Sequence, residues 1–181
     1  MHRRFLKKDL YPGIMHFCLF WGAMFLLIAT SISAIEDNLH QWLHIEFPTR
    51  GFRVQAGFIW DLAGGGLATI GVAMAFFRRY VLRPPRLNTL FEDPIILLVI
   101  LSLIVTGFAV EGLRIGATEL NPASTFYNPD IAIWSPIGFA FAKMFTGLAG
   151  LSVSTLESLH FLMWWSHAAI VAFAFAYGAI R

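Results

Sequence analysis

Two histidines, His160 and His167, lie seven residues apart in the apolar segment LHFLMWWSHAAIVAFAFAYGAIR at the end of the chain. Seven residues advance an α-helix by about 700°, close to two full turns, so both imidazoles lie on one helix face. A third histidine, His16, lies in the apolar segment that follows the basic start of the chain. Ionisable side chains inside a membrane helix are costly and indicate a function by default.

Imidazoles on helices that face one another are the usual ligands of haem iron in a helical bundle. Zinc requires cysteines or carboxylates at metal-ligand spacing, and the chain has a single cysteine, Cys18. A proton pathway requires a series of carboxylates through the membrane, and none is visible. Three histidines in two apolar segments therefore favour haem binding over plain hydrogen bonds between helices.

The composition is that of a membrane protein, because 57% of the 181 residues are hydrophobic and only 13% are charged. Four segments reach the length of about twenty residues that crosses the hydrocarbon. They are residues 11–34, 57–82, 93–113 and 157–181. A backbone in lipid must satisfy its own hydrogen bonds, so the sequence predicts an all-α, polytopic transmembrane helical bundle.

A fifth segment, 131–155, is apolar enough to span but contains Lys143, Pro136 and several hydroxyls. Four spans with a cytoplasmic N-terminus place most Lys and Arg residues on the inside, as membrane proteins prefer. A fifth span would leave Arg181 on the outer face. We therefore predict four spans, with 131–155 lying on or dipping into the outer surface.

The stretch AGGGLATIG, with Gly64 and Gly71, has neither the preceding strand nor the following Lys of a phosphate-binding loop. Small residues in a membrane helix permit close approach of another helix or of a flat ligand. The pattern favours helix packing over a cofactor face.

Four stretches together resemble a known membrane cytochrome b family: YPGIMHFCLFWGAMFLLIAT, DLAGGGLATIGVAMAFFRRYVLRPPRL, TGFAVEGLRI and LHFLMWWSH. The family includes the nitrate reductase gamma subunit and the heterodisulfide reductase cytochrome b subunit. The likeness is closest to the branch associated with heterodisulfide-reductase-like iron–sulfur proteins, of the electron-transfer-flavoprotein:menaquinone oxidoreductase type. It covers nearly the whole chain and implies one membrane cytochrome b-like domain over residues 1–181.

The resemblance implies one or two b haems between the first and last spans, in a bacterial or archaeal cytoplasmic membrane. Electrons would pass between menaquinone, or another quinone, and a cytoplasmic iron–sulfur partner, so the chain would be the electron-transfer subunit of a quinone oxidoreductase complex. His16 and His167 match haem ligands of the family, and His160 matches either a ligand or the quinone site. His160 and His167 lie only about 10.5 Å apart, too close for two stacked haems in one groove, so we expect that one of the two, His160, is not an iron ligand.

The chain departs from the family at two points. Leu26 stands where the nitrate reductase branch has a second histidine, and the sequence ends at Arg181, before a further histidine of related chains. His16 also lies about 9 Å from the inner edge of its span and His167 about 21 Å, a poor opposing pair without tilt or sliding. Either the chain is truncated at its C-terminal end, or His16 finds its partner on another subunit.

A quinone site requires a proton donor or acceptor at each carbonyl, near the membrane interface. Asp61, Glu111, Arg114 and His160 all lie toward the predicted outer ends of spans and are our candidates, with Asp61 as the proton carrier. The alternative for Asp61 is an ion pair with Arg114 or a helix cap. The alternative for the whole chain is a non-redox membrane anchor or assembly subunit, whose histidines serve only helix contacts.

Overall fold

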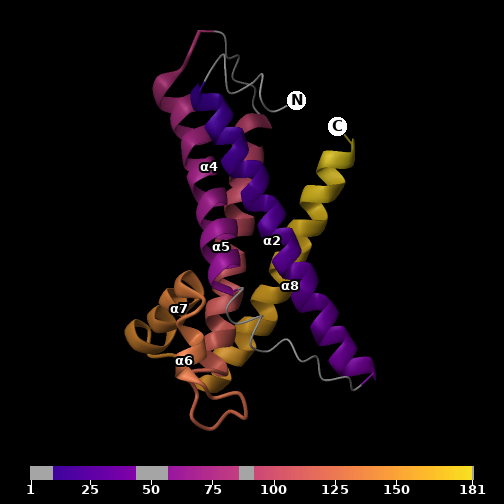
Figure 1. Cartoon of the computed structure of the whole chain (residues 1–181), viewed down its shortest axis with the longest axis vertical. Helices are drawn as coiled ribbons and strands as arrows, with labels where there is room; N and C mark the ends of the chain where they lie inside the picture. Colours follow the sequence, from indigo (N-terminus) through magenta and orange to yellow (C-terminus); the bar gives the residue numbers. More distant parts are fainter. Residues whose placement is uncertain (1–9, 44–56, 86–91, 181) are drawn as a thin grey trace. The chain divides into compact units, whose positions relative to one another are not determined.

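A computed structural model describes residues 10–43, 57–85 and 92–180, and these residues form helices, turns and loops without a strand (Figure 1). The elements in the first half are α2 (Leu10–Leu43), the π-helix η1 (Trp60–Gly66), α4 (Leu67–Phe76) and the π-helix η2 (Phe77–Leu82). Those in the second half are α5 (Glu92–Ala117), α6 (Pro129–Ala132), α7 (Pro136–Lys143), the π-helix η3 (Met144–Leu148) and α8 (Val153–Ile180).

Among the described residues, four helical segments are long and apolar enough to cross a membrane. They are Leu10–Ile32, Gly57–Leu82, Asp93–Ala117 and Val153–Tyr177. The predicted all-helical chain with four spans is confirmed, and the chain is a multi-pass membrane protein. The basic residues at the start of the chain lie outside the described residues, so the cytoplasmic N-terminus stays a prediction.

The predicted ends of the first and last spans differ from the observed helix ends. Helix α2 continues to Leu43 because no glycine or proline interrupts the residues after the apolar run. Helix α8 begins at Val153 because Ser152 precedes it as a cap, its Oγ accepting a hydrogen bond from the Thr155 N–H at 3.3 Å.

Before α8 begins at Val153, segment 131–155 contains only short helices, of which α7 has eight residues. Gly150 adopts a left-handed backbone conformation, with φ of 59°, between η3 and the cap of α8, so no helix runs through this segment. Lys143 is exposed, and its Nζ lies 5.3 Å from the centre of the Phe139 ring. The prediction that this segment does not span is confirmed.

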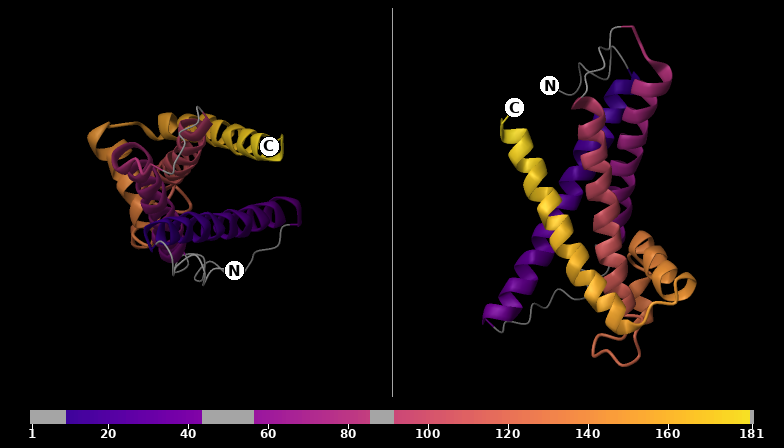
Figure 2. Two further views of the ribbon diagram at one scale, coloured as in Figure 1. Left: turned by 90° about the horizontal axis from the view of Figure 1, so that it is seen from above. Right: turned by 180° about the vertical axis from the view of Figure 1, so that it is seen from behind.

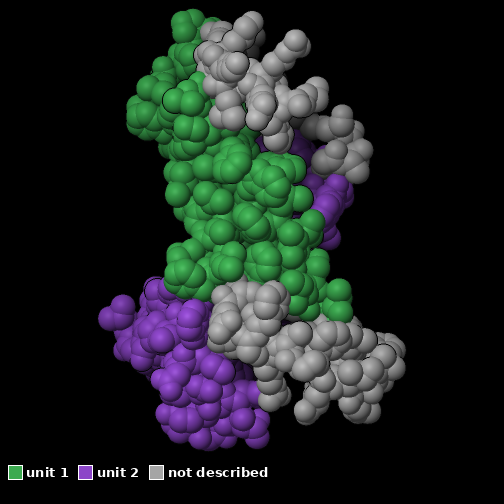
Figure 3. All heavy atoms as spheres, viewed as in Figure 1, with its two compact units in different colours: residues 1–90 green, residues 91–181 purple. Residues whose placement is uncertain are grey.

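The chain divides into two compact units, residues 1–90 and 91–181 (Figure 3). In the first unit, α2 packs antiparallel against η1 and α4 (Figure 1). The contact line, called the glycine seam below, pairs Leu19 with Gly71, Gly22 with Ala68, and Leu26 with Gly64. Without a hydrophobic force between helices in lipid, association depends on such close backbone contact. The helix-packing role predicted for Gly64 and Gly71 is therefore observed.

The second span is helical throughout, but π-turns occur at both of its ends, which the sequence pattern did not predict. A π-turn shifts the hydrogen bonds to acceptors five residues back and so disturbs the bonding at its junction with an α-helix. Side-chain hydroxyls bond carbonyl oxygens at both junctions. The Thr69 hydroxyl donates to Gly65 O at 2.7 Å, and the Tyr11 hydroxyl donates to Met74 O at 3.0 Å.

In the second unit, α5 packs against α8 and against the short helix α7 (Figure 2). Leu113 and Ala117 form a buried cluster with Leu156 of α8. Ile115 forms another with Ala132 of α6 and Ala142 of α7. These two clusters fix the C-terminal end of α5, where the candidate site begins.

Large apolar side chains face outward along the spans. On α8, Phe161 is 67% and Phe175 is 70% exposed, and Phe76 at the end of α4 is 55% exposed. Such faces are suited to lipid rather than water.

Candidate functional site

The two histidines of α8 lie on its face toward α5. His160 and His167 are half-buried, as is Met163 between them, whereas Phe161 on another face is largely exposed. Leu156, one turn before His160, is buried against α5. The shared face that the spacing predicted is therefore observed.

His167 makes a specific contact with Thr106 of α5. Thr106 Oγ1 lies 2.7 Å from His167 Nδ1 and 2.6 Å from the carbonyl oxygen of Ser102, one turn earlier. A hydroxyl has one proton and a carbonyl oxygen can only accept, so the Thr106 hydroxyl donates to Ser102 and accepts from Nδ1–H. The hydrogen-bond pattern thus assigns the proton of the neutral ring to Nδ1 and leaves the lone pair on Nε2.

This arrangement fits an iron ligand. A metal-binding histidine normally donates its second ring N–H to a nearby oxygen, which fixes the tautomer and the ring orientation. A Cβ on Gly107 would lie 3.5 Å from His167 Cε1, so the backbone of α5 leaves room for a methyl group beside the ring. In the described part of the chain, no three His, Cys, Asp or Glu side chains gather around a common point, but haem iron needs only one or two protein ligands.

His16 lies on α2, in the first unit, away from the glycine seam. It is exposed, whereas its neighbours Met15 and Cys18 are buried. Within the described residues no hydrogen bond joins His16 to another side chain or to the backbone of α4. Its role as a haem ligand stays a prediction.

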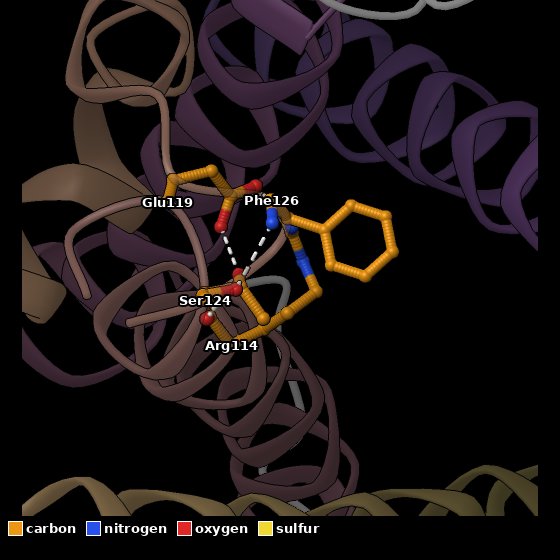
Figure 4. A network of polar contacts seen from close by, with 5 residues as sticks. Arg114, Glu119, Ser124 and Phe126 are labelled. Atoms are coloured by element: carbon orange, nitrogen blue, oxygen red, sulfur yellow. Dashed lines mark hydrogen bonds and ion pairs between the residues drawn. The ribbon is translucent and has the colours of Figure 1, made fainter. Parts of the chain in front are cut away.

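A polar network closes the C-terminal end of α5 (Figure 4). Arg114 Nη1 donates to Glu119 Oε1 in an ion pair, and the side chains of Arg114 and Glu119 point toward each other. The Thr118 hydroxyl lies 2.7 Å from the Arg114 carbonyl oxygen and is also hydrogen-bonded to Glu119 Oε2. The following loop folds on itself, with the Phe126 N–H donating to Ser124 Oγ at 3.1 Å. Arg114 is therefore paired with a carboxylate that the sequence pattern did not predict.

The network holds the pKa of Glu119 below its ordinary value of 4.5. Burial alone raises this pKa, but the Arg114 charge and the hydrogen bonds from Thr118 and Arg114 outweigh burial. A carboxylate whose pKa is lower in the folded state stabilises the fold fully above the unfolded pKa of about 4.3. This contribution is lost as the pH falls through the folded value.

We expect Glu119→Gln to lower the free energy of unfolding by about 1 kcal/mol at neutral pH, because an amide pairs with Arg114 less strongly. The variant should also lose less stability than the wild type when the pH falls below about 4.3. Thermal unfolding in detergent across this pH range measures both effects. Glu157→Gln, which changes an exposed carboxylate of α8, is the control; identical pH profiles for Glu119→Gln and the wild type would contradict the prediction.

Two of the predicted quinone-site residues, His160 and Arg114, belong to the second unit. The positive charge of Arg114 acts on the His160 imidazole, so the two groups lie in the same region near the C-terminal end of α5. His160 is half-buried, and the Arg114 side chain is 38% exposed despite its ion pair. No hydrogen bond joins the two side chains in the described part of the chain, and their shared role at a quinone stays a prediction.

Glu111 lies on α5 but is held against α7. A Cβ on Gly138, in the first turn of α7, would lie 2.9 Å from Glu111 Oε2, so only glycine leaves space for this carboxylate. Ser135, the residue before α7, makes no side-chain cap hydrogen bond. A negative charge beside a helix N-terminus is stabilising, so this position favours the fold. The predicted role of Glu111 at the quinone site stays a prediction.

Asp61 lies in η1, in the first unit, and is 5% exposed. It is the one charged side chain that is buried among the described residues. Asp61 belongs to the first unit, whereas His160, Arg114 and Glu111 belong to the second. Its role as proton carrier stays a prediction.

Similarity to known proteins is found at the level of sequence, since no family model and no solved structure matches the chain. The chain aligns over 176 residues, 95% of its length, with EtfAB:quinone oxidoreductase of Syntrophomonas wolfei, at 38% identity and over 23% of that protein. It aligns over 135 residues, 70% of its length, with a subunit of the dihydromethanophenazine:CoB--CoM heterodisulfide reductase of Methanosarcina acetivorans, at 27% identity and over 51% of that protein. The family resemblance is confirmed.

The four sequence stretches resemble two groups of proteins, and each relative is named after one of them. The first is an EtfAB:quinone oxidoreductase, and the second is a heterodisulfide reductase subunit. The chain spans about a quarter of one relative and about half of the other.

Two residues of the site, Thr106 and Glu119, were not predicted from the sequence. A hydroxyl within a span is a general signal for contact between helices, but it does not identify the partner. Glu119 follows Arg114 by five residues, beyond the spacing at which residues on one helix face meet, so no helical pattern predicted the pair.

Proposed function

We propose that the chain is the haem b-binding membrane subunit of a quinone-linked electron-transfer complex, which passes electrons between menaquinone and an iron–sulfur partner. The observation that most directly supports haem is His167, whose Nδ1–H is engaged by Thr106 while Nε2 keeps its lone pair. The names of the two relatives support the link to a quinone and to a heterodisulfide reductase-like partner.

In this proposal His167 Nε2 is an iron ligand and His16 supplies a further nitrogen. Haem, when bound, accepts and releases one electron at a time, at a potential set by its ligands and their hydrogen bonds. Gly107 of α5 lies beside the Cε1 edge of the His167 ring, and Thr106 holds the orientation of the ring. Whether the chain holds one haem or two depends on the partner of His16.

We assign the quinone to the end of α5, where the charge of Arg114 acts on the His160 imidazole. The imidazole exchanges a proton with a quinone oxygen, and the guanidinium stabilises negative charge on that oxygen. Glu119 fixes Arg114 in place. Glu111, which lies against α7, and Asp61, in the first unit, remain the candidates for proton transfer.

The iron–sulfur cluster belongs to a partner in this proposal. Such clusters are held by cysteine thiolates, and the single cysteine of this chain, Cys18, is buried in α2. Arg78, Arg79 and Arg83 in and after η2 would mark the cytoplasmic side on which the partner docks.

A reduced-minus-oxidised visible spectrum of the purified, full-length complex tests the proposal. We expect b-type haem bands, and we expect the reduced haem to be reoxidised when a menaquinone analogue is added. A flat spectrum would leave the chain as a membrane anchor or assembly subunit. A haem spectrum that does not respond to the quinone would keep the haem assignment and remove the quinone assignment.

A further inference from the structure

The Thr106 hydroxyl that contacts His167 is a polar group within a membrane span, where most side chains are apolar. Thr106 belongs to the third span and His167 to the fourth, and their side chains join through one hydrogen bond of 2.7 Å. Where no water can replace a lost partner, a hydrogen bond of this kind constrains both groups. We propose that Thr106 is a positioning residue that fixes the tautomer and orientation of His167 and thereby sets the reduction potential of the haem. This inference rests on the proposed haem-binding function.

The direction of the hydrogen bonds gives the mechanism. The Nδ1–H of His167 donates to Thr106 Oγ1, and the Thr106 hydroxyl donates in turn to Ser102 O at 2.6 Å and more weakly toward Leu103 O at 3.4 Å. Hydrogen bonds in a chain polarise one another, so a hydroxyl that donates is a better acceptor. The imidazole consequently carries more electron density on Nε2, because an acceptor behind the ring makes a metal-binding histidine more basic.

A more electron-rich imidazole stabilises ferric over ferrous iron, because the oxidised state carries one more positive charge. Removal of the acceptor should therefore raise the reduction potential of the haem. It should also let the His167 imidazole rotate more freely, since the Thr106 hydroxyl is the hydrogen-bond partner that the structure gives His167 among the described residues.

Thr106 is well suited to this role because its own rotamer is restricted. A threonine on a helix has two heavy atoms on Cβ, and its hydroxyl bonds the carbonyl of the previous turn. The acceptor atom is therefore held in one place on α5, and the imidazole must turn toward it.

The test uses Thr106→Val, which keeps the shape of the side chain and removes the hydroxyl, and Thr106→Ser, which keeps the hydroxyl. Potentiometric titration of the haem bands and the g-values of the ferric haem are measured in the assembled complex. We expect Thr106→Val to raise the midpoint potential, up to a tenfold change in the reduction equilibrium or about 59 mV for one electron. Thr106→Ser should restore the wild-type values.

The matched control is Thr69→Val, which removes a hydroxyl bonded in the same way to the previous turn, at 2.7 Å from Gly65 O, but on a span without a histidine partner. It should leave the potential and the g-values unchanged. If Thr106→Val does not insert into the membrane, Thr106→Ala replaces it with the same expectation.

Two failures have different meanings. A wild-type complex without haem bands would overturn the proposed function and this inference together. A wild-type complex with haem whose potential and g-values are the same in Thr106→Val, or shift equally in Thr69→Val, would overturn the inference alone and leave His167 as a ligand held by packing.

Discussion

Replacing His167 by alanine should remove the b-type haem bands of the complex. If the chain holds a single haem the absorbance falls to background, and if it holds two the absorbance falls by roughly half, because one iron keeps its other ligands. The physical reason is that neither residue that α5 places against the ring can replace the imidazole: Thr106 presents a hydroxyl that is already engaged, and Gly107 presents no side chain. Haem content is measured by the pyridine haemochrome spectrum, relative to the protein.

His160→Ala is the matched control, since it removes an imidazole from the same face of α8. We expect it to keep the haem bands and to slow reoxidation by a menaquinone analogue.

His167→Met addresses the concern that the alanine variant lacks haem only because it is misfolded. A thioether ligand retains iron but raises the haem potential and changes the spectrum. Full haem content with an unchanged spectrum in His167→Ala would refute the assignment.

The second large effect concerns the glycine seam of the first unit. We expect Gly22→Ala to lower the free energy of unfolding by about 1–3 kcal/mol, because the added methyl overpacks the contact between α2 and α4. Its Cβ would lie 2.5 Å from the backbone nitrogen of Ala68 and 2.8 Å from its Cα. Backbone atoms cannot rotate away, so the two helices must separate. The unfolding midpoint of the helical circular-dichroism signal in detergent measures the loss.

Gly66→Ala provides the control for helix propensity. Gly66 lies in the same glycine run as Gly64, but no atom lies within 4 Å of the position of its added Cβ. Alanine favours a helix over glycine by about 1 kcal/mol, so this variant should be as stable as the wild type or slightly more stable. Equal unfolding midpoints for Gly22→Ala and Gly66→Ala would show that α2 and α4 do not meet at Gly22.

Much of the fold could be predicted from the sequence because a membrane imposes a length on each helix. Apolar runs identified all four spans, and the distribution of Lys and Arg argued against a fifth span at 131–155, which is apolar enough to cross. The helix ends were less predictable, because they depend on local bonding. The cap at Ser152 and the left-handed Gly150 fix the start of α8, and the absence of a breaker lets α2 run to Leu43.

The candidate site was predictable only where it depends on one helix. The spacing of His160 and His167 predicted their shared face, since that follows from helix geometry alone. The partners on α5 depend on how α5 and α8 pack, and Thr106 looks in sequence like Thr69, which also bonds its own previous turn. The pairing of Arg114 with Glu119 depends on a loop that turns back after α5.

The outward-facing aromatic side chains of α4 and α8 have a thermodynamic consequence. A soluble protein buries its apolar side chains, and their exposure to water on unfolding produces a large positive change in heat capacity. Phe76, Phe161 and Phe175 already lie outside any core, and in detergent they contact hydrocarbon both before and after the helices separate. The heat capacity should therefore change little on unfolding. Cooling should not lower the free energy of unfolding of this protein, as it does for a soluble protein with a hydrophobic core.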